Sequence, residues 1–234
     1  MADNQFDGAF YNRFYENRRT QVTTPTEMAR RAVAVAGIVQ YFELPVRRIL
    51  DAGCGLGWMR PALERAFPTA TYEGLEISEH LCRRFGWTHG SVSDYRTRRR
   101  LDLVVCYDVL QYLSDRDAAR AIVNLGRLSR GALYFDVPTV EDWRRNADRS
   151  RSDDAIHLRD ADWYRHRLGR YFRHVALGVH IRRGVPFVQW ELERAVPEET
   201  KSSHQKRAKK GLKNKRAGSD SVSRTGAEAE IRSK

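Results

Sequence analysis

The stretch Ile49-Leu50-Asp51-Ala52-Gly53-Cys54-Gly55-Leu56-Gly57 decides the fold of this chain. A short apolar run ends in an acidic residue, and glycines then stand at every second position. Glycine is needed where a backbone turns tightly and approaches a ligand without Cβ atoms in the way. A dinucleotide-binding fingerprint requires a further glycine where Trp58 stands, so that alternative fails. The stretch therefore predicts a strand, a ligand-binding turn and a helix in succession.

Short β-type runs alternate with helical runs beyond this stretch, which is typical of a parallel α/β sheet. Strands are predicted at residues 48–51, 71–75, 87–92, 101–107 and 132–137, and helices at 59–66, 79–84, 117–128 and 161–167. A helix from Pro25 to about Phe42 comes before them, because Thr24-Pro25-Thr26-Glu27 is a helix-start signal. Two β-rich segments, 171–181 and 185–193, follow with a hairpin turn predicted at 182–184.

Four motifs in order resemble those of the class I S-adenosylmethionine-dependent methyltransferase family, over about residues 26–194. They are the glycine stretch, Gly74-Leu75-Glu76-Ile77-Ser78, Gly90-Ser91-Val92-Ser93-Asp94, and the run from Leu101 to Leu113. Pattern and resemblance together predict an α/β fold. It is a Rossmann-like, seven-stranded, mostly parallel sheet with helices on both faces and a C-terminal antiparallel hairpin.

The resemblance implies a site for S-adenosyl-L-methionine. Asp51 would fix the methionine amino group, and Glu76 would accept hydrogen bonds from both ribose hydroxyls, which a two-oxygen acceptor can do. Asp94 either meets the adenine amino group or pairs with a neighbouring arginine. The full set of expected cofactor residues is Tyr11, Tyr15, Arg18, Asp51, Ala52, Gly53, Cys54, Gly55, Gly57, Glu76, Ile77, Ser93, Asp94, Asp108 and Val109.

Two residues are candidates for acid–base chemistry. His157 follows the predicted fifth strand, in the segment that typically roofs the substrate pocket, and histidine titrates near neutrality. Tyr112 stands where many small-molecule methyltransferases carry histidine, so its role is open between proton transfer and hydrogen bonding. Carboxylates and histidines are scattered, and no metal site is predicted.

The chain divides into an aromatic N-terminal arm at 1–24, a methyltransferase domain at 25–198 and a basic tail at 199–234. The arm either closes over the cofactor or packs on the sheet edge. The formal charge is +12, with 31 basic and 27 acidic residues up to position 200 and 11 basic and 3 acidic residues after it. The tail has too few apolar residues to fold, so we expect it to be disordered. It either makes weak, non-specific contact with nucleic acid or is merely solvated.

The sequence predicts methyl transfer to a small-molecule acceptor at O, N or C. The Asn/Asp-Pro-Pro-Tyr turn of adenine-directed methyltransferases is absent, and no cysteine follows a proline as in attack on a pyrimidine. Two alternatives stay open: methylation of RNA or protein tethered by the tail, and a non-catalytic regulator that binds the cofactor. Three cysteines in no disulfide pattern, without an apolar run that spans a bilayer or a signal segment, predict a cytoplasmic protein without membrane contact.

Overall fold

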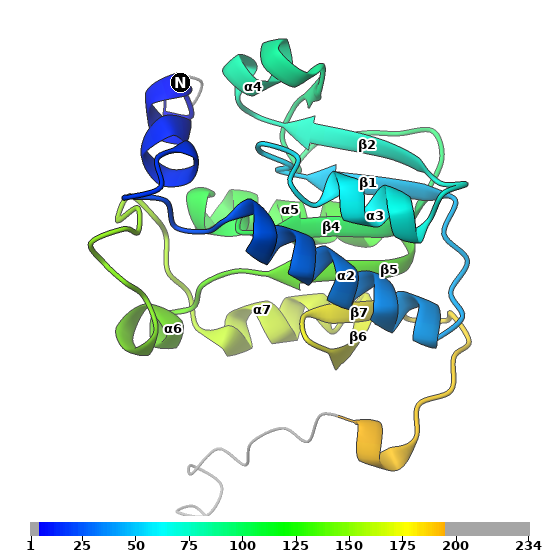
Figure 1. The fold of residues 1–234 in the computed structure, drawn as a ribbon. Helices are drawn as coiled ribbons and strands as arrows, with labels where there is room; N and C mark the ends of the chain where they lie inside the picture. Colours follow the sequence, from blue (N-terminus) through cyan, green and yellow to red (C-terminus); the bar gives the residue numbers. More distant parts are fainter. Residues whose placement is uncertain (1–4, 195–234) are drawn as a thin grey trace, which may run out of the picture. The chain divides into compact units, whose positions relative to one another are not determined.

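A seven-stranded mixed sheet lies at the centre of the protein, in a computed structural model that describes residues 5–194 (Figure 1). The strand order is β3-β2-β1-β4-β5-β7-β6. The strands are β1 (Arg48–Ala52), β2 (Thr71–Glu76), β3 (Thr88–His89), β4 (Leu101–Tyr107), β5 (Ser129–Asp136), β6 (Phe172–Ala176) and β7 (Val179–Arg182). The strands β1 to β5 run parallel to one another, whereas β7 runs antiparallel to both β5 and β6.

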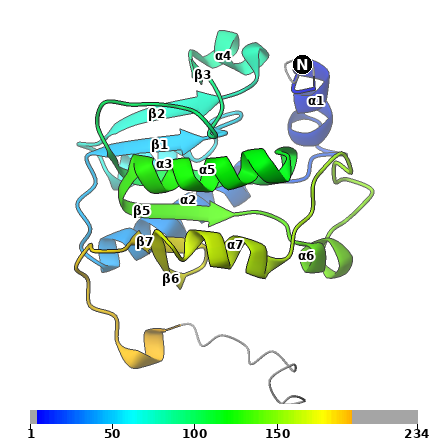
Figure 2. The ribbon, with the colours of Figure 1, turned by 180° about the vertical axis from the view of Figure 1, so that it is seen from behind.

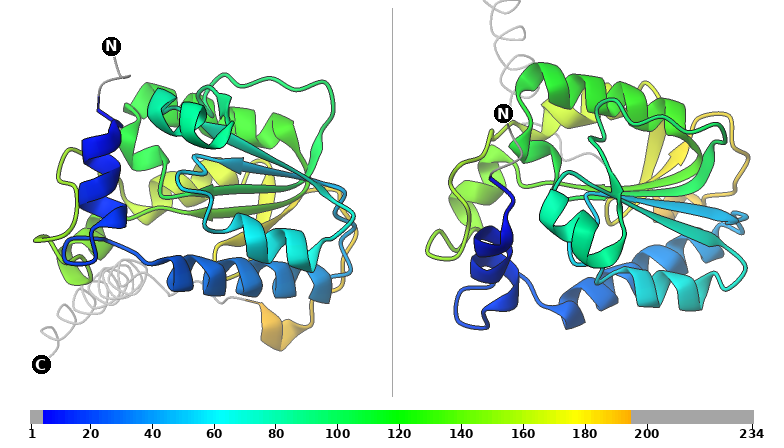
Figure 3. Two further views of the ribbon diagram at one scale, coloured as in Figure 1. Left: turned by 45° about the horizontal axis from the view of Figure 1, so that its top comes forward. Right: turned by 90° about the horizontal axis from the view of Figure 1, so that it is seen from above.

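Helices cover both faces of the sheet, which gives the three layers seen in Figure 2 and in the right-hand view of Figure 3. The helical segments are α1 (Gly8–Tyr11), the π-helical turn η1 (Asn12–Glu16), α2 (Pro25–Tyr41), α3 (Arg60–Ala66), α4 (Glu79–Phe85), the 3₁₀ turn η2 (Leu110–Tyr112), α5 (Asp115–Leu128), α6 (Val140–Arg145), α7 (Ala161–Leu168) and the 3₁₀ turn η3 (Glu191–Glu193). Within these described residues, no helix has the length and apolar character needed to span a membrane.

The two faces of the sheet belong to two apolar clusters. Helices α2 and α3 pack on one face and α5 and α7 on the other. Successive side chains of a strand point to opposite faces, so Ile49 lies in the first cluster and its neighbour Leu50 in the second. This division explains why the central strands are apolar at nearly every position.

Helix α2 begins where the sequence predicts. The Thr24 hydroxyl accepts a hydrogen bond from the Glu27 N–H at 3.1 Å, and the Glu27 carboxylate accepts one from the Thr24 N–H at 2.8 Å. This capping box satisfies two N–H groups that the first turn of a helix leaves without partners. The box fixes the point at which the chain leaves the N-terminal arm and enters the helix.

The hairpin predicted around 182–184 is wrong, although the chain does turn at Arg183-Gly184. The chain reverses at Leu177-Gly178, between β6 and β7, and residues 185–193 contain the short turn η3 and no strand. Gly178 has a φ of +76°, and a Cβ atom there would lie 2.8 Å from the backbone oxygen of Phe135. The apolar residues on both sides of Gly178 make the sequence look like one continuous strand.

Two further predictions need correction. The strand predicted at 87–92 shortens to the two residues of β3, and the chain turns at residues 92–94, where the N–H groups of Asp94 and Tyr95 donate to the Ser91 backbone oxygen. The charged segment after β5 contains α6, which the sequence analysis did not predict. It begins with a second capping box, between Thr139 and Asp142.

The topology places a binding site at one end of the sheet. From β1 the chain continues to β2 on one side, while β4 pairs with β1 on the other side. The loops after β1 and β4 therefore diverge, and ligands of open α/β sheets bind in the opening between such loops. Helices α1 and α6 lie at this end, to which the arrowheads of β1 and β2 point in Figure 1.

Candidate active site

A cavity of about 440 Å³ lies at the carboxyl ends of β1, β2 and β4, and we call it the glycine-turn cavity. It is lined by most of the residues predicted to hold a cofactor. These are Tyr11, Tyr15, Asp51, Gly53, Cys54, Gly55, Glu76, Ile77, Ser93, Asp94, Asp108 and Val109, and the candidate Tyr112 joins them. Further lining residues that the sequence did not single out include Phe6, Phe10, Met28, Trp58, Met59 and Val92.

The glycine turn is tied to the neighbouring strand. The N–H groups of Gly53 and Cys54 donate to the backbone oxygen of Leu75, at 2.7 and 3.2 Å. Gly53 has a φ of +76°, and a Cβ atom there would lie 2.3 Å from Val109. Gly55 has a φ of +52°, and a Cβ atom there would meet nothing within 4 Å. The turn thus needs glycine for its conformation, and at Gly55 it leaves open space beside the cavity.

Glu76 is a buried carboxylate with a fixed orientation. It is 3% exposed, and its Oε1 accepts the N–H groups of Ile77 and Ser78 at 2.9 and 3.0 Å. Its Oε2 accepts the Gly55 N–H at 2.8 Å. A carboxylate oxygen has two lone pairs, so Oε2 has capacity for one more donor from the cavity. Tyr11 donates its hydroxyl to Oε1 from the N-terminal arm, at 3.3 Å.

Asp51 is the second buried acid of this cavity. Tyr72 donates its hydroxyl to Asp51 at 2.6 Å. Burial raises the pKa of Asp51 to about 6, against the effect of that hydrogen bond, and the nearby charge of Glu76 raises it further. Asp51 therefore changes its charge near neutral pH, and a cationic group beside it would favour the ionised form.

The N-terminal arm lies across the glycine-turn cavity. The Phe6 ring meets Tyr112 at a centroid distance of 5.1 Å, and the Tyr15 ring meets Trp58 at 6.1 Å. Ser78 donates its hydroxyl to the backbone oxygen of Phe6 at 2.5 Å. Of the two roles left open by the sequence, this geometry favours closure over the site rather than packing on the sheet edge.

A second cavity of about 310 Å³ adjoins the first, and we call it the acidic cavity. Both cavities share four lining residues, namely Tyr15, Tyr107, Asp108 and Tyr112. The acidic cavity is also lined by Phe14, Val22, Gln111, Asp136, Val137, Pro138, Asp142, Trp143, Ala147, Ser152, Asp153 and Ile156. It is therefore built from the arm, the loop after β4, and the segment between β5 and α7.

Asp108 and Gln111 form a pair in the wall of the acidic cavity. Asp108 has a φ of +59°, which is uncommon for a residue with a side chain. Gln111 donates its amide nitrogen to the Asp108 carboxylate at 2.5 Å and to its backbone oxygen at 3.0 Å. Burial is the main reason that the pKa of Asp108 rises to about 6, and Asp136 adds to the rise.

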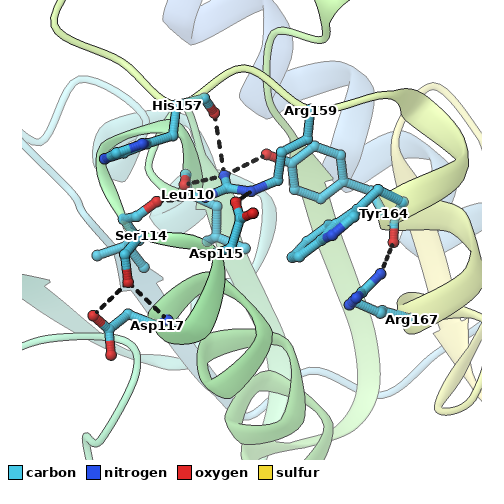
Figure 4. A network of polar contacts seen from close by, with 10 residues as sticks. Leu110, Ser114, Asp115, Asp117, His157, Arg159, Tyr164 and Arg167 are labelled. Carbon is cyan, nitrogen blue, oxygen red and sulfur yellow. Dashed lines mark hydrogen bonds and ion pairs between the residues drawn. The ribbon is translucent and has the colours of Figure 1, made fainter.

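Arg159 joins the segment after β5 to the loop after β4 (Figure 4). It is 5% exposed and extends among groups that all accept hydrogen bonds from its guanidinium. The acceptors are the backbone oxygens of Leu110 at 3.0 Å, Leu113 at 2.5 Å and His157 at 3.2 Å, the Tyr164 hydroxyl at 3.1 Å and the Asp115 carboxylate at 2.8 Å. Arg159 thereby holds η2, which carries Gln111 and Tyr112, against the segment between β5 and α7.

The structure does not bring four predicted residues into either cavity. His157 is exposed, and only its backbone joins the network, through its N–H to Gln111 at 2.7 Å and its oxygen to Arg159. Arg18 is exposed on the turn after η1. Ala52 is wholly buried in β1, and Gly57 faces the ring of Trp87. The polar residue that does line the acidic cavity beside Asp108 is Gln111. No sequence pattern marks Gln111 as a site residue.

Known proteins share this fold. A family model described as a methyltransferase domain matches residues 24–189. A search of the curated proteins finds no match. Magnesium protoporphyrin IX methyltransferase (ChlM) from Synechocystis PCC 6803, solved with bound SAH, is similar with a TM-score of 0.53 at 18% identity, over 77% of this chain and 97% of that one. CalS10 from Micromonospora echinaspora, an amino pentose methyltransferase solved with SAM, has a TM-score of 0.52 at 16% identity, over 66% and 91%.

This chain also matches two other solved structures, over a smaller part of each. It covers 50% of DesVI from Streptomyces venezuelae and 49% of the sugar N-methyltransferase KedS8 from Streptoalloteichus sp ATCC 53650, at 22% and 26% identity and TM-scores of 0.40 and 0.42. The chain thus spans about half the length of these two proteins. The structural likeness establishes the fold, and the family model covers most of the domain. The chain belongs to the methyltransferase-domain family.

Proposed function

We propose that the protein is an S-adenosylmethionine-dependent methyltransferase that acts on a small-molecule acceptor. One observation carries the proposal: the glycine-turn cavity, with Asp51 and Glu76 in its wall, adjoins a second cavity through four shared residues. One cavity suits a nucleoside cofactor, and the other suits the molecule to be methylated. The volume of each lies within or near the range of small-molecule sites, which is roughly 300–1,000 Å³.

The residues of the glycine-turn cavity fit the cofactor. The Oε2 atom of Glu76 has a free acceptor position for one ribose hydroxyl. The second ribose hydroxyl would replace the Tyr11 hydroxyl at Oε1, which comes from the N-terminal arm. Asp51 would hold the methionine ammonium group, and Ser93 and Asp94 lie where the adenine would meet the chain. S-adenosylmethionine would supply a methyl group activated by its positively charged sulfur.

The residues between the cavities define where transfer would take place. Tyr15, Asp108 and Tyr112 face both cavities, so the acceptor atom and the methyl group would meet beside them. Alignment of two reactants is a large contribution that a protein makes to a displacement of this kind. The arm above them would shield the reacting atoms from water, and the Tyr112 hydroxyl would donate a hydrogen bond. His157 faces neither cavity, so we assign it no step.

Cofactor binding is tested by isothermal titration with S-adenosylhomocysteine. The wild-type protein is expected to bind it, and Glu76→Ala is expected to weaken binding by about 100-fold, because two hydroxyl hydrogen bonds to a charged acceptor are lost. Glu79→Gln is the matched control, since Glu79 is an exposed carboxylate three residues further on whose partner among residues 5–194 is Arg83. Absence of binding to the wild-type protein would refute the proposal.

Transfer itself is tested with methyl-labelled S-adenosylmethionine and a metabolite extract. Label in small molecules supports an enzyme, whereas cofactor binding without label in any acceptor supports the regulator. Label confined to added RNA or protein would support the tethered alternative. The cytoplasmic location expected from the sequence stays a prediction, as does the weak contact of residues 201–234 with nucleic acid.

A further inference from the structure

We propose that the acidic cavity binds the acceptor as a small organic amine that carries at least one N–H, and that this nitrogen receives the methyl group. The inference rests on the proposed methyl transfer and names the chemical class of its substrate. Two independent observations carry it: the composition of the cavity wall, and a buried acceptor atom in that wall without a partner.

The wall of the acidic cavity has charge of one sign. Four lining residues are aspartates, Asp108, Asp136, Asp142 and Asp153, and none of the lining residues of this cavity in residues 5–194 is Lys, Arg or His. Arg31, which does not line the cavity, forms an ion pair with Asp136 at 3.5 Å and leaves the other three aspartates without an arginine partner from the lining. Hydrogen bonds from Thr139 hold the pKa of Asp142 below its usual range, so this group is ionised at neutral pH. A cation is therefore favoured here, and an anion is disfavoured.

Aromatic rings complete the wall. Phe14, Tyr15, Tyr107, Tyr112 and Trp143 line the same cavity. The faces of such rings attract organic cations, and an ammonium group gains most where it is withdrawn from water. Within the described part of the chain, no three His, Cys, Asp or Glu side chains come close enough together to hold a metal ion. The four aspartates lie around the cavity together with the aromatic rings, and this arrangement suits an organic cation.

Gln111 supplies the second observation. Its side chain is 2% exposed, and its amide nitrogen must be the atom that faces Asp108, because only that end can donate to a carboxylate. Gln111 lines the acidic cavity, and its Oε1, the end of the amide that does not meet Asp108, has no hydrogen-bond partner among the described residues. A buried acceptor without a partner costs about 1–3 kcal/mol, and a ligand that donates an N–H or O–H removes this cost.

The two observations together favour an amine over an alcohol. Both an alcohol and an amine can donate to Gln111 Oε1, but only the amine also brings the positive charge that the aspartates favour. Asp108 lies next to Gln111 and faces both cavities, so it is placed to take the proton that a protonated amine must lose. The freed nitrogen lone pair then forms the N–C bond, and the electron pair of the broken S–C bond goes to the sulfur of S-adenosylmethionine.

The first experiment separates acceptor classes in one metabolite extract. Half of the extract is treated with N-acetoxysuccinimide, which converts primary and secondary amines into neutral amides. Both halves are then incubated with the protein and methyl-labelled S-adenosylmethionine. We expect label in the cation-retained fraction of the untreated half and at least a tenfold loss of label in the treated half. Label that survives acetylation, or that appears in neutral or acidic compounds, overturns the amine and leaves the methyltransferase intact.

The second experiment measures acceptor binding without turnover. Binding of 2-phenylethylamine, 2-phenylethanol and phenylacetate is compared in the presence of S-adenosylhomocysteine. These probes have similar size and differ in charge. We expect the amine to bind at least tenfold more tightly than the alcohol, because charge-assisted contacts are stronger than neutral ones. Equal binding of amine and alcohol, or tighter binding of the acid, overturns the proposal.

Variants locate the effect in the acidic cavity. Asp153→Asn is expected to weaken binding of the amine by about tenfold and to leave binding of S-adenosylhomocysteine unchanged, because Asp153 lines only the acidic cavity. Gln111→Met is expected to weaken binding of the amine by about tenfold. Asp154→Asn is the matched control, because Asp154 is the exposed neighbour of Asp153 and lines neither cavity. An equal effect of the Asp153 and Asp154 variants would overturn the assignment. Loss of S-adenosylhomocysteine binding by the wild-type protein would instead refute the methyltransferase.

Discussion

Asp51 is a buried carboxylate whose ionised form depends on a nearby cation. In the sequence it marks the end of the first strand before the glycine turn. In the structure it is 4% exposed and held by the Tyr72 hydroxyl. Because burial raises its pKa to about 6, the ionised group is poorly accommodated until a cation lies beside it. The position is therefore costly for the empty protein and favourable for an ammonium-bearing ligand.

This cost predicts a pH dependence of stability that belongs to Asp51. A group whose pKa is higher in the folded than in the unfolded state adds stability at low pH and loses it as the pH rises through the folded value. The unfolded value is about 4. Lowering the pH from 7 to 5 should therefore stabilise the wild-type protein by about 1 kcal/mol relative to Asp51→Asn. Urea unfolding of both proteins across this range measures the difference, and a difference independent of pH contradicts the prediction.

At the scale of the elements, Arg159 connects two segments that are far apart in sequence. Its guanidinium bonds two backbone oxygens of the loop after β4, Leu110 and Leu113, and one carboxylate at the start of α5, Asp115. Ring faces of Trp163 and Tyr164 lie within 5.0 and 6.0 Å of it. One buried side chain, that of Arg159, thereby joins the segment between β5 and α7 to the loop after β4, and both of these segments line the acidic cavity.

Replacement of Arg159 tests this connection. Arg159→Met keeps much of the side-chain volume but leaves several buried acceptors without a donor, so we expect a loss of about 3–5 kcal/mol of unfolding free energy. Limited proteolysis should also begin to cut between residues 145 and 158. Arg165→Met is the matched control, since the side-chain partner of Arg165 in the described part of the chain is the exposed Asp162 and its loss should cost less than about 0.5 kcal/mol. Equal stability of the two variants would contradict a connecting role.

The same elements show what the sequence can and cannot reveal. The glycine turn, the strand ends at Asp51 and Glu76 and the cap at Thr24 are local, because each depends on a few neighbouring residues, and each was predicted. The turn at Leu177-Gly178 was missed because the apolar pattern continues through it. Gln111 was missed because its importance comes from Asp108 and from a roof contributed some 30–40 residues later. Contacts of that kind are decided by packing, and a single sequence carries no local signal for them.

At the scale of the whole molecule, the sequence separates a domain of nearly balanced charge from a basic tail. Residues up to 200 carry a net +4 of the total +12, and residues 201–234 carry the remaining +8. The predicted tail at 199–234, the end of the predicted domain and residues 1–4 of the arm lie outside the described residues. The described part contains both apolar clusters and both cavities.

Deletion of residues 201–234 is therefore expected to leave the melting temperature and the methylation of small molecules unchanged. Retention on immobilised single-stranded RNA at low salt should fall sharply, because 11 basic residues are removed with only 3 acidic ones. Melting curves, turnover with the amine acceptor and salt elution profiles measure the three effects. A drop in turnover on a small acceptor would contradict the prediction and favour the tethered alternative.

The wall shared by the two cavities has a thermodynamic consequence. Tyr15, Tyr107, Asp108 and Tyr112 touch both spaces, so an occupant of one space changes the surface that the other presents. Linkage requires the influence to be mutual: whatever factor the cofactor imposes on the affinity for the acceptor, the acceptor imposes on the affinity for the cofactor. On the proposed function, the two cavities would act as one coupled site, and a change of any of these four residues is expected to alter recognition of both ligands together.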